Sequence, residues 1–294
     1  MIVSVPATSA NLGPGFDTLG LALDLKNTFH ITPSKLMSIH IVGEGENRPK
    51  LLVDNVFVKI FNEILEQNQY EARPFKFLFH NQIPISRGLG SSSAVIIGAI
   101  FSAYHIMQKP IDKHEILNLA LKYENHPDNI TPALFGGFNV AMLESQEVVS
   151  LQKPIPSEIK AVVVVPYTTM STRFSRRTLP KKYTAKDAVF NLSHACVLTS
   201  AFMSGNWELL RLASKDRFHQ DVRMKNFPVL FKVQKTALEC GALMSTLSGS
   251  GSSFLNICYQ EDSVLLKEKL EKKFPKFRIF ELAFDNLGAT LIES

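Results

Sequence analysis

The chain has 294 residues, 45% of them hydrophobic and 20% charged, which is the composition of a globular protein with a substantial core. Its net charge of +5 suits anionic ligands, but the basic residues are scattered along the chain, which argues against nucleic-acid binding. Three widely spaced cysteines, a strand-like start and no apolar run of membrane-spanning length argue against a disulfide scaffold, a secretory signal and a membrane span, and predict a cytoplasmic protein.

Hydrophobic periodicity predicts an α+β chain of two domains. In the first half the predicted strands are 1–5, 18–25, 27–32, 37–42, 75–83 and 138–143, and the predicted helices are 56–67, 92–108 and 113–124. In the second half the predicted strands are 159–165, 254–259 and 277–284, and the predicted helices are 185–203, 207–214, 227–240 and 262–274. A stretch with two prolines at 144–157 indicates the boundary, which gives domains 1–156 and 157–294.

The segment that follows the first predicted strand, residues 6–15, is predicted to be a loop because it contains two prolines and two glycines. Asn11 and Asp17 bracket its glycine turn. Asparagine and aspartate commonly cap turns with their own side chains, so local chemistry alone favours a turn role for both. By the same reasoning, Asn55 is most simply the N-cap of the helix at 56–67.

The most informative stretch is 84–94, which lies between an aromatic-rich predicted strand and an apolar predicted helix. Gly88 and Gly90 allow the backbone to approach an anion closely, and the start of a helix offers free N–H groups and the positive end of its dipole. The stretch lacks the lysine of a Walker A loop and is not a GxGxxG fingerprint. Two interpretations remain, a phosphate-binding loop or a serine-rich helix cap.

Glu124 shares the apolar stripe of the predicted helix 113–124 with Leu117 and Leu121. A carboxylate on such a stripe needs a partner because an unpaired buried charge is costly. The partner is either a nearby lysine or arginine, or Mg²⁺, which prefers carboxylate, hydroxyl and phosphate oxygens.

Three motifs in a fixed order resemble those of the GHMP kinases. Pro-x-x-x-Gly-Leu-Gly-Ser-Ser-x-Ala at 84–94 resembles the nucleotide-phosphate loop of that family, with Ser93 where alanine is usual. Residues 6–17 resemble its N-terminal motif and residues 247–253 its C-terminal glycine motif. The resemblance implies a two-domain GHMP kinase fold, with a ribosomal-protein-like N-terminal domain, a ferredoxin-like C-terminal domain and the site between them.

The resemblance also implies two cofactors, ATP and Mg²⁺. The residues implied to bind the nucleotide are Asn55, Pro84, Ile85, Ser86, Arg87, Gly88, Leu89, Gly90, Ser91, Ser92, Ser93, Ala94, Thr172, Gly249 and Gly251. Ser92 and Glu124 are implied to hold the metal, and Asn55 is only a weak contact beside the adenine.

The string His-Pro-Asp-Asn at 126–129, continued to Gly137, resembles the homoserine kinase branch of this family more than the others. Asn129 stands where mevalonate kinase-like members carry a catalytic aspartate. An amide cannot accept a proton as a base, so the mechanism is expected to rely on positioning and charge stabilisation. His126 and Asp128 are the only nearby side chains that could serve as a base instead.

Two further stretches, at 171–180 and 216–223, resemble the segments that supply substrate-binding arginines. They assign Arg176 and Arg223, although Arg173 and Arg177 lie close enough to Arg176 for the assignment to slip. Two guanidinium groups would suit a carboxylate, which they can bind bidentately. The residues implied to bind substrate are Asn11, Asp17, His126, Asn129, Arg176 and Arg223, and those implied to act in catalysis are Asn129 and Arg176.

The resemblance implies ATP-dependent phosphorylation of L-homoserine to O-phospho-L-homoserine, a step toward threonine. The alternatives are another GHMP kinase, acting on mevalonate, a sugar or the cytidylyl-methylerythritol intermediate, and a non-catalytic ligand sensor. The expected partner is a small molecule rather than nucleic acid or membrane, and the sequence leaves a homodimer open.

Overall fold

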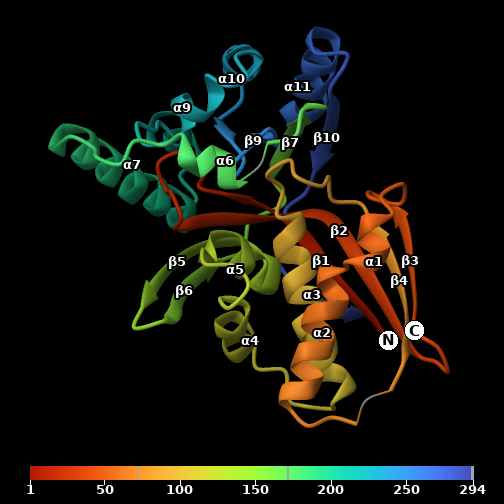
Figure 1. The fold of residues 1–294 in the computed structure, drawn as a ribbon. Helices are drawn as coiled ribbons and strands as arrows, with labels where there is room; N and C mark the ends of the chain where they lie inside the picture. Colours follow the sequence, from red (N-terminus) through yellow and green to blue (C-terminus); the bar gives the residue numbers. More distant parts are fainter. Residues whose placement is uncertain (72, 171, 293–294) are drawn as a thin grey trace.

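The computed structural model describes residues 1–292 except 72 and 171, and the side chains of residues 172 and 173 lie outside the description. Two β-sheets, each covered by helices, form a mixed α+β fold (Figure 1). None of the described helices is long and apolar enough to cross a membrane.

The larger sheet has seven strands, six from the first half of the chain and one from its end. They are β1 (Ile2–Ala10), β2 (Leu19–Pro33), β3 (Ser38–Gly43), β4 (Phe75–Asn81), β5 (Phe138–Glu144), β6 (Glu147–Lys153) and β11 (Thr290–Ile292). The order is β11-β1-β2-β4-β3, and the hairpin of β5 and β6 joins β2 through β5. Only the β3–β4 pair is parallel among the described pairings of this sheet.

Helices cover one face of this sheet. They are α1 (Lys50–Val53), α2 (Val56–Gln67), α3 (Ser91–Ile106), α4 (Lys113–Ala120) and α5 (Pro127–Phe135). α2 and α3 lie side by side against β1, β2 and β4 (Figure 1). Alternate residues of the strands point toward them, so that Phe29, Phe77 and Phe79 make tilted and edge-on contacts with Phe57 and Phe61 of α2 in the main core.

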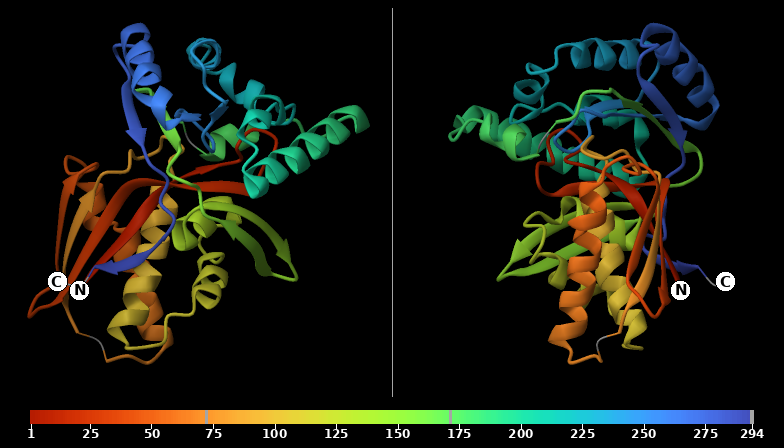
Figure 2. Two further views of the ribbon diagram at one scale, coloured as in Figure 1. Left: turned by 180° about the vertical axis from the view of Figure 1, so that it is seen from behind. Right: turned by 45° about the vertical axis from the view of Figure 1, so that its right-hand side comes forward.

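The second sheet is antiparallel and has four strands in the order β10-β7-β9-β8. They are β7 (Ile159–Val165), β8 (Met244–Leu247), β9 (Phe254–Tyr259) and β10 (Arg278–Leu282). Around them lie α6 (Thr172–Arg177), α7 (Ala185–Ser204), the 3₁₀ turn η1 (Trp207–Leu209), α8 (Leu210–Ala213), α9 (Gln220–Met224), α10 (Val229–Glu239) and α11 (Gln260–Lys273). α10 and α11 bury a second apolar core against this sheet, and α7 projects from the body (Figure 2).

The chain passes from the larger sheet to the smaller one between β6 and β7, at 154–158. After β10 it returns, and β11 pairs with β1 (Figure 2). The predicted division into 1–156 and 157–294 stays a prediction, and the returning strand shows that the end of the chain contributes to the sheet of the first half.

Several predicted elements have different bounds in the structure, and three of these differences affect the site. β1 continues to Ala10 through the first half of the predicted loop, and its pairing with β2 shifts register beside Pro6, where the missing N–H would break a regular ladder. The predicted strands 18–25 and 27–32 are one strand, because Asn27 accepts backbone hydrogen bonds from Gln82 and Ile83 instead of forming a turn. The predicted helix 113–124 ends at Ala120, so Glu124 lies beyond its end.

Sequence reasoning missed several short elements, among them β6, β11 and α5. β6 lies within the predicted linker and follows a two-residue turn in which Ser145 and Gln146 both have positive φ. This turn lacks the glycine or asparagine that normally signals a hairpin. β11 is a strand of only three residues, and α5 contains Pro132, which argues against a helix in the sequence.

Candidate active site

A cavity of about 540 Å³ lies where the loop before α3 meets α6 and the glycine turn after β8. Its walls come from both halves of the chain. Asn11 at the end of β1, the loop at 84–90, Glu124, Arg176 and Gly249 all line it. The fold therefore brings together segments that are up to 238 positions apart in the sequence, as in the hydrogen bond from Asn11 Nδ2 to Gly249 O.

The N-terminus of α3 forms the middle of this cavity. Gly90 is its N-cap, and Gly88 and Gly90 have φ angles of +76° and +68°. A Cβ on Gly90 would lie 1.9 Å from Thr8 Oγ1, and a Cβ on Gly88 would lie 2.1 Å from Ser248 O. Glycine is thus required by both conformation and space. The free N–H groups of the first turn and the helix dipole suit an anion at this place.

The glycine turn after β8 holds the same loop from the other side. Ser248 Oγ donates to Gly88 O at 2.6 Å, and the backbone N–H of Ser253 donates to Arg87 O at 2.9 Å. The Arg87 guanidinium donates to Pro166 O at 2.9 Å and to the carbonyl of Ile85 at 3.2 Å. Its Nη2 donates to Tyr167 O, so this arginine anchors the loop to the end of β7 and all three of its nitrogens are occupied.

One end of the cavity is apolar. Phe29, Ile41, Leu51, Val56 and Phe79 line it, together with Asn55. The predicted N-cap is confirmed, since Asn55 Oδ1 accepts from the Val58 N–H at 3.2 Å. Its Nδ2 donates to Leu51 O at 2.9 Å, so both amide atoms already have partners within α1 and α2.

The opposite end is rich in charge. Arg176 Nη1 and Nη2 donate to the two carboxylate oxygens of Asp17 at 3.0 and 2.5 Å, and the guanidinium lies 5.2 Å from the ring centre of Phe16. His126 Nδ1 lies 3.0 Å from Glu124 Oε1. This hydrogen bond raises the pKa of His126 despite partial burial, and the charge of Asp17 adds to the effect.

Asp128 and Asn129 lie at the N-terminus of α5, beside this charged end. Thr8 Oγ1 donates to Asn129 Oδ1 at 2.7 Å, and Asn129 Nδ2 donates to Asp128 Oδ1 at 3.4 Å. Burial, together with the nearby charges of Asp17 and Glu124, raises the pKa of Asp128 to about 7 against the opposing effect of His126 and Arg176.

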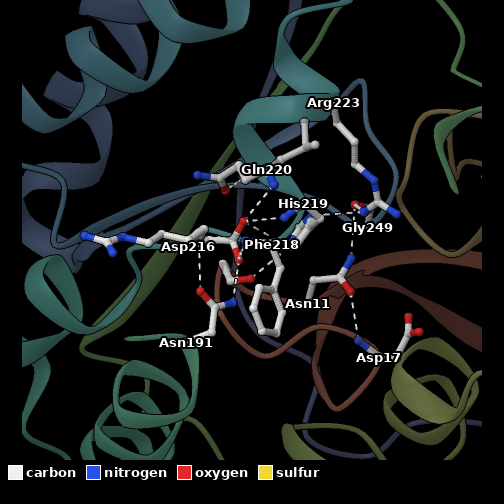
Figure 3. A network of polar contacts seen from close by, with 12 residues as sticks. Asn11, Asp17, Asn191, Asp216, Phe218, His219, Gln220, Arg223 and Gly249 are labelled. Atoms are coloured by element: carbon white, nitrogen blue, oxygen red, sulfur yellow. Dashed lines mark hydrogen bonds and ion pairs between the residues drawn. The ribbon is translucent and has the colours of Figure 1, made fainter. Parts of the chain in front are cut away.

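Arg223 and His219 complete the charged end (Figure 3). Arg223 is 1% exposed, and its Nη1 donates to Gly249 O and to His219 Nδ1, both at 3.0 Å. His219 Nε2 lies 2.8 Å from Gly13 O. Burial and the neighbouring positive charge of Arg176 together lower the pKa of Arg223 to about 10, against the opposing charges of Asp17, Asp128 and Asp216.

Most residues predicted for the site lie on this one cavity. Asn11, Asn55, the run from Pro84 to Ser93, Glu124, His126, Asn129, Arg176, Arg223 and Gly249 line it. Asp17 reaches it through Arg176, whereas Ala94 is fully buried in the core below and Gly251 does not line the cavity. Arg177 is exposed and does not line the cavity, and the predicted side chains of Thr172 and Arg173 lie outside the described part.

Sequence reasoning missed two side chains of this site. Thr8 was assigned to a loop, but β1 carries it to Asn129 and under Gly90. His219 belongs to the stretch at 216–223 that was singled out for Arg223 alone. Its spacing of four residues from Arg223 places both on one side of a helical turn, which is the signal that could have identified it.

Comparison with known proteins agrees with this geometry. Residues 55–137 match the GHMP kinases N terminal domain, and residues 198–276 match the GHMP kinases C terminal domain. The chain is 72% identical to the homoserine kinase of Helicobacter hepaticus, with all of both chains covered. The chain belongs to the GHMP kinase family. It is also 63% identical to the homoserine kinase of Wolinella succinogenes, over 98% of each chain.

Solved structures of GHMP kinases share the fold. A homoserine kinase from Cytophaga hutchinsonii superimposes with a TM-score of 0.88 at 24% identity and covers 99% of this chain, which covers 97% of that one. A mevalonate kinase superimposes with a TM-score of 0.74 at 18% identity, over 97% and 99% of the two chains. The expected two-domain GHMP kinase fold is therefore confirmed.

Proposed function

We propose that this GHMP kinase transfers the γ-phosphoryl group of ATP to the hydroxyl of L-homoserine, giving O-phospho-L-homoserine for threonine synthesis. The observation that carries the proposal is the pairing, in one cavity, of a helix N-terminus suited to phosphates with a charged end suited to an amino acid. The apolar end beside Phe29 and Val56 would take the adenine, because a flat base buries well against aliphatic and aromatic side chains.

The charged end suits a zwitterion. The Asp17 carboxylate would accept hydrogen bonds from the substrate ammonium group, and the guanidinium groups of Arg176 and Arg223 would bind its carboxylate. In the structure Asp17 and Arg176 bind each other, so an amino acid would replace an internal ion pair with two ion pairs of its own. Mevalonate has no ammonium group, and a neutral sugar has neither charge.

The residues present fit a magnesium ion carried in with the nucleotide. In the described chain no group of three or more His, Cys, Asp or Glu side chains could hold a metal by itself. Ser92 is exposed at the first turn of α3, and Glu124 is partly exposed, with His126 on one of its oxygens. One hydroxyl and one carboxylate, completed by phosphate oxygens and water, are a usual Mg²⁺ set. When bound, the ion would neutralise charge on the phosphate oxygens.

Catalysis is proposed to rely on positioning rather than on a general base. Asn129 cannot accept a proton, and its amide is fixed by Thr8 and Asp128. The N–H groups of the loop would stabilise the charge on the transferring group, while the substrate hydroxyl loses its proton late, to the phosphoryl oxygens. Arg176 would help to hold the acceptor in line with the γ-phosphate.

The test is ADP release with a panel of alcohols, namely L-homoserine, mevalonate, galactose and the cytidylyl-methylerythritol intermediate. We expect homoserine to have the highest kcat/KM by far, with a product that carries phosphate on the side-chain oxygen. If another alcohol is turned over faster, that alcohol and not homoserine is the substrate of this protein. Homoserine binding without any ADP release would instead favour a ligand sensor.

A further inference from the structure

His219 is 1% exposed, and the carboxylate of Asp216 fixes the backbone turn that carries it (Figure 3). The backbone N–H groups of His219 and Gln220 donate to Asp216 Oδ2 at 2.8 and 2.7 Å. Asp216 Oδ1 accepts from the Phe218 N–H and from Asn191 Nδ2, at 3.0 and 2.7 Å. Four donors on one buried carboxylate leave the start of α9 little freedom, so the imidazole ring has a fixed position.

The contacts of the ring determine its tautomer. His219 Nε2 lies 2.8 Å from Gly13 O, and a carbonyl oxygen can only accept, so Nε2 carries the hydrogen. In the neutral ring Nδ1 is then an acceptor, and Arg223 Nη1 donates to it at 3.0 Å. Burial lowers the pKa of His219 to about 4, and the positive charge of Arg223 acts in the same direction.

These contacts decide which edge of Arg223 is free. Nη1 has two hydrogens, one for His219 Nδ1 and one for Gly249 O at 3.0 Å, so it is fully used. Nε is buried and has no acceptor among the described residues. The Nε and Nη2 edge of the guanidinium, whose two N–H bonds are parallel, therefore remains for a ligand with two acceptor oxygens.

Arg176 also has a buried Nε without an acceptor among the described residues, but its end-on pair of nitrogens, Nη1 and Nη2, already binds both oxygens of Asp17. Arg223 has no carboxylate partner among its described hydrogen bonds, and its burial makes an unpaired N–H costly until an anion binds.

We infer that His219 is a positioning residue for the acceptor substrate: by taking one hydrogen of Arg223 Nη1, it turns the Nε and Nη2 edge toward the substrate carboxylate. The inference rests on the proposed function, because it assigns Arg223 to a carboxylate-bearing alcohol. His219 also connects the backbone at Gly13 to Arg223. A displacement of the N-terminal motif would therefore displace the arginine that is proposed to bind the carboxylate.

Three variants of His219 separate positioning from general stability. His219→Phe keeps an aromatic ring beside Phe16, whose ring centre is 5.1 Å away, but has no acceptor. His219→Gln has a donor and an acceptor of similar reach. His219→Ala removes the side chain, and His105→Ala is the control, because His105 is exposed near the far end of α3.

The measurements are kcat and KM for L-homoserine, for 3-aminopropan-1-ol, which is homoserine without its carboxylate, and for ATP. His219→Phe and His219→Ala should lower the preference for homoserine over 3-aminopropan-1-ol by about 10- to 100-fold, the effect of losing a well-aligned charged hydrogen bond. The loss should appear in the KM for homoserine, with the KM for ATP near wild type. His219→Gln should regain most of the preference, and His105→Ala should keep it.

A merely structural role would lower turnover of both alcohols equally and leave their ratio unchanged in His219→Phe. That result, in protein that still binds ATP and melts cooperatively, would overturn the inference. If His219→Ala does not fold, the comparison of His219→Phe with His219→Gln decides. Failure of the wild-type protein to phosphorylate homoserine would overturn the proposed function, and this inference with it, and is seen before any variant is made.

Discussion

Two regions of the cavity are built from different materials. The region at the N-terminus of α3, named here the phosphate end after the proposed function, is made of backbone, where Gly88, Gly90 and the first turn of α3 present N–H groups within one continuous stretch of chain. The charged end described above, named here the acceptor end, is made of side chains, Asp17, Arg176 and Arg223 among them, which come from three distant segments. The first end can be recognised from a single motif, whereas the second exists only after folding.

The difference has a functional meaning. Backbone N–H groups bind any phosphate chain and do not distinguish one acceptor from another. Side chains with fixed charges define the acceptor, because an unpaired buried charge penalises a substrate that lacks the complementary group. Changes at the phosphate end should therefore affect every substrate, and changes at the acceptor end should affect selectivity.

The largest effect is expected for Gly90→Ala. The new Cβ would lie 1.9 Å from Thr8 Oγ1 at a φ of +68°, so both the clash and the strain act on the loop. Backbone strain alone costs about 1–3 kcal/mol. ATP binding should be lost, or the protein destabilised, as measured by calorimetry and thermal melting.

Gly205→Ala is the matched control for that change. Gly205 has a similar φ of +74°, but its Cβ would meet nothing closer than a Trp207 ring atom at 3.9 Å. It should lose some stability and keep ATP affinity. Equal losses of ATP affinity in both variants would mean that the close approach at Gly90 is not needed for phosphate binding.

The next effect in size is expected for Glu124→Gln, which tests the junction between the two ends. An amide is a poorer Mg²⁺ ligand than a carboxylate, so kcat/KM should fall by about 100-fold or more, the scale for losing one group that stabilises transition-state charge. The apparent KM for Mg²⁺ should rise. His126→Ala removes the hydrogen bond between His126 and Glu124 but keeps the carboxylate, so it is the control for loss of that contact. Near wild-type activity of Glu124→Gln at limiting Mg²⁺ would exclude Glu124 from the metal site.

Arg176→Lys and Arg223→Lys should each weaken kcat/KM for homoserine by about 1–3 kcal/mol, because an ammonium group cannot reproduce two parallel N–H bonds. The KM for ATP should change little. Arg177→Lys is the control, since Arg177 is exposed and outside the cavity. If both variants keep the wild-type kcat/KM, the carboxylate is bound elsewhere.

An effect on stability rather than on turnover is expected for Asp128→Asn. The pKa of Asp128 is raised by folding to about 7, so its contribution to stability is present below the pKa of the unfolded chain, about 4, and is lost as the pH rises through 7. The upper limit is about 4 kcal/mol. Urea unfolding should show Asp128→Asn to be more stable than wild type at pH 8 but not at pH 4.

Glu268→Gln is the control for the removal of one negative charge, because Glu268 is exposed on α11. The difference in the free energy of unfolding between Glu268→Gln and wild type should be the same at pH 4 and at pH 8. A difference between Asp128→Asn and wild type that is the same at pH 4 and pH 8 would mean that Asp128 does not change its protonation on folding.

The same contrast explains what could be predicted from the sequence. The strand, loop and helix around Gly88 and Gly90 follow from local patterning, and the structure places them as expected. The role of β1 was harder to predict, because Pro6 and its register shift resemble a loop. The spacing of His219 from Arg223 could have drawn attention to it, but its contact with Gly13 could not be predicted, because the two residues are 206 positions apart.

The central claim, that the acceptor end selects a zwitterion while the phosphate end is indifferent to it, can be tested by removing one substrate charge at a time. The measurement is kcat/KM of the wild-type protein for L-homoserine, 3-aminopropan-1-ol and 4-hydroxybutanoate, with the KM for ATP determined alongside each. We predict that loss of either charge lowers kcat/KM by about 100-fold or more, the scale on which unpaired site charges reject an analogue, while the KM for ATP stays constant. Equal turnover of homoserine and either analogue would contradict the account.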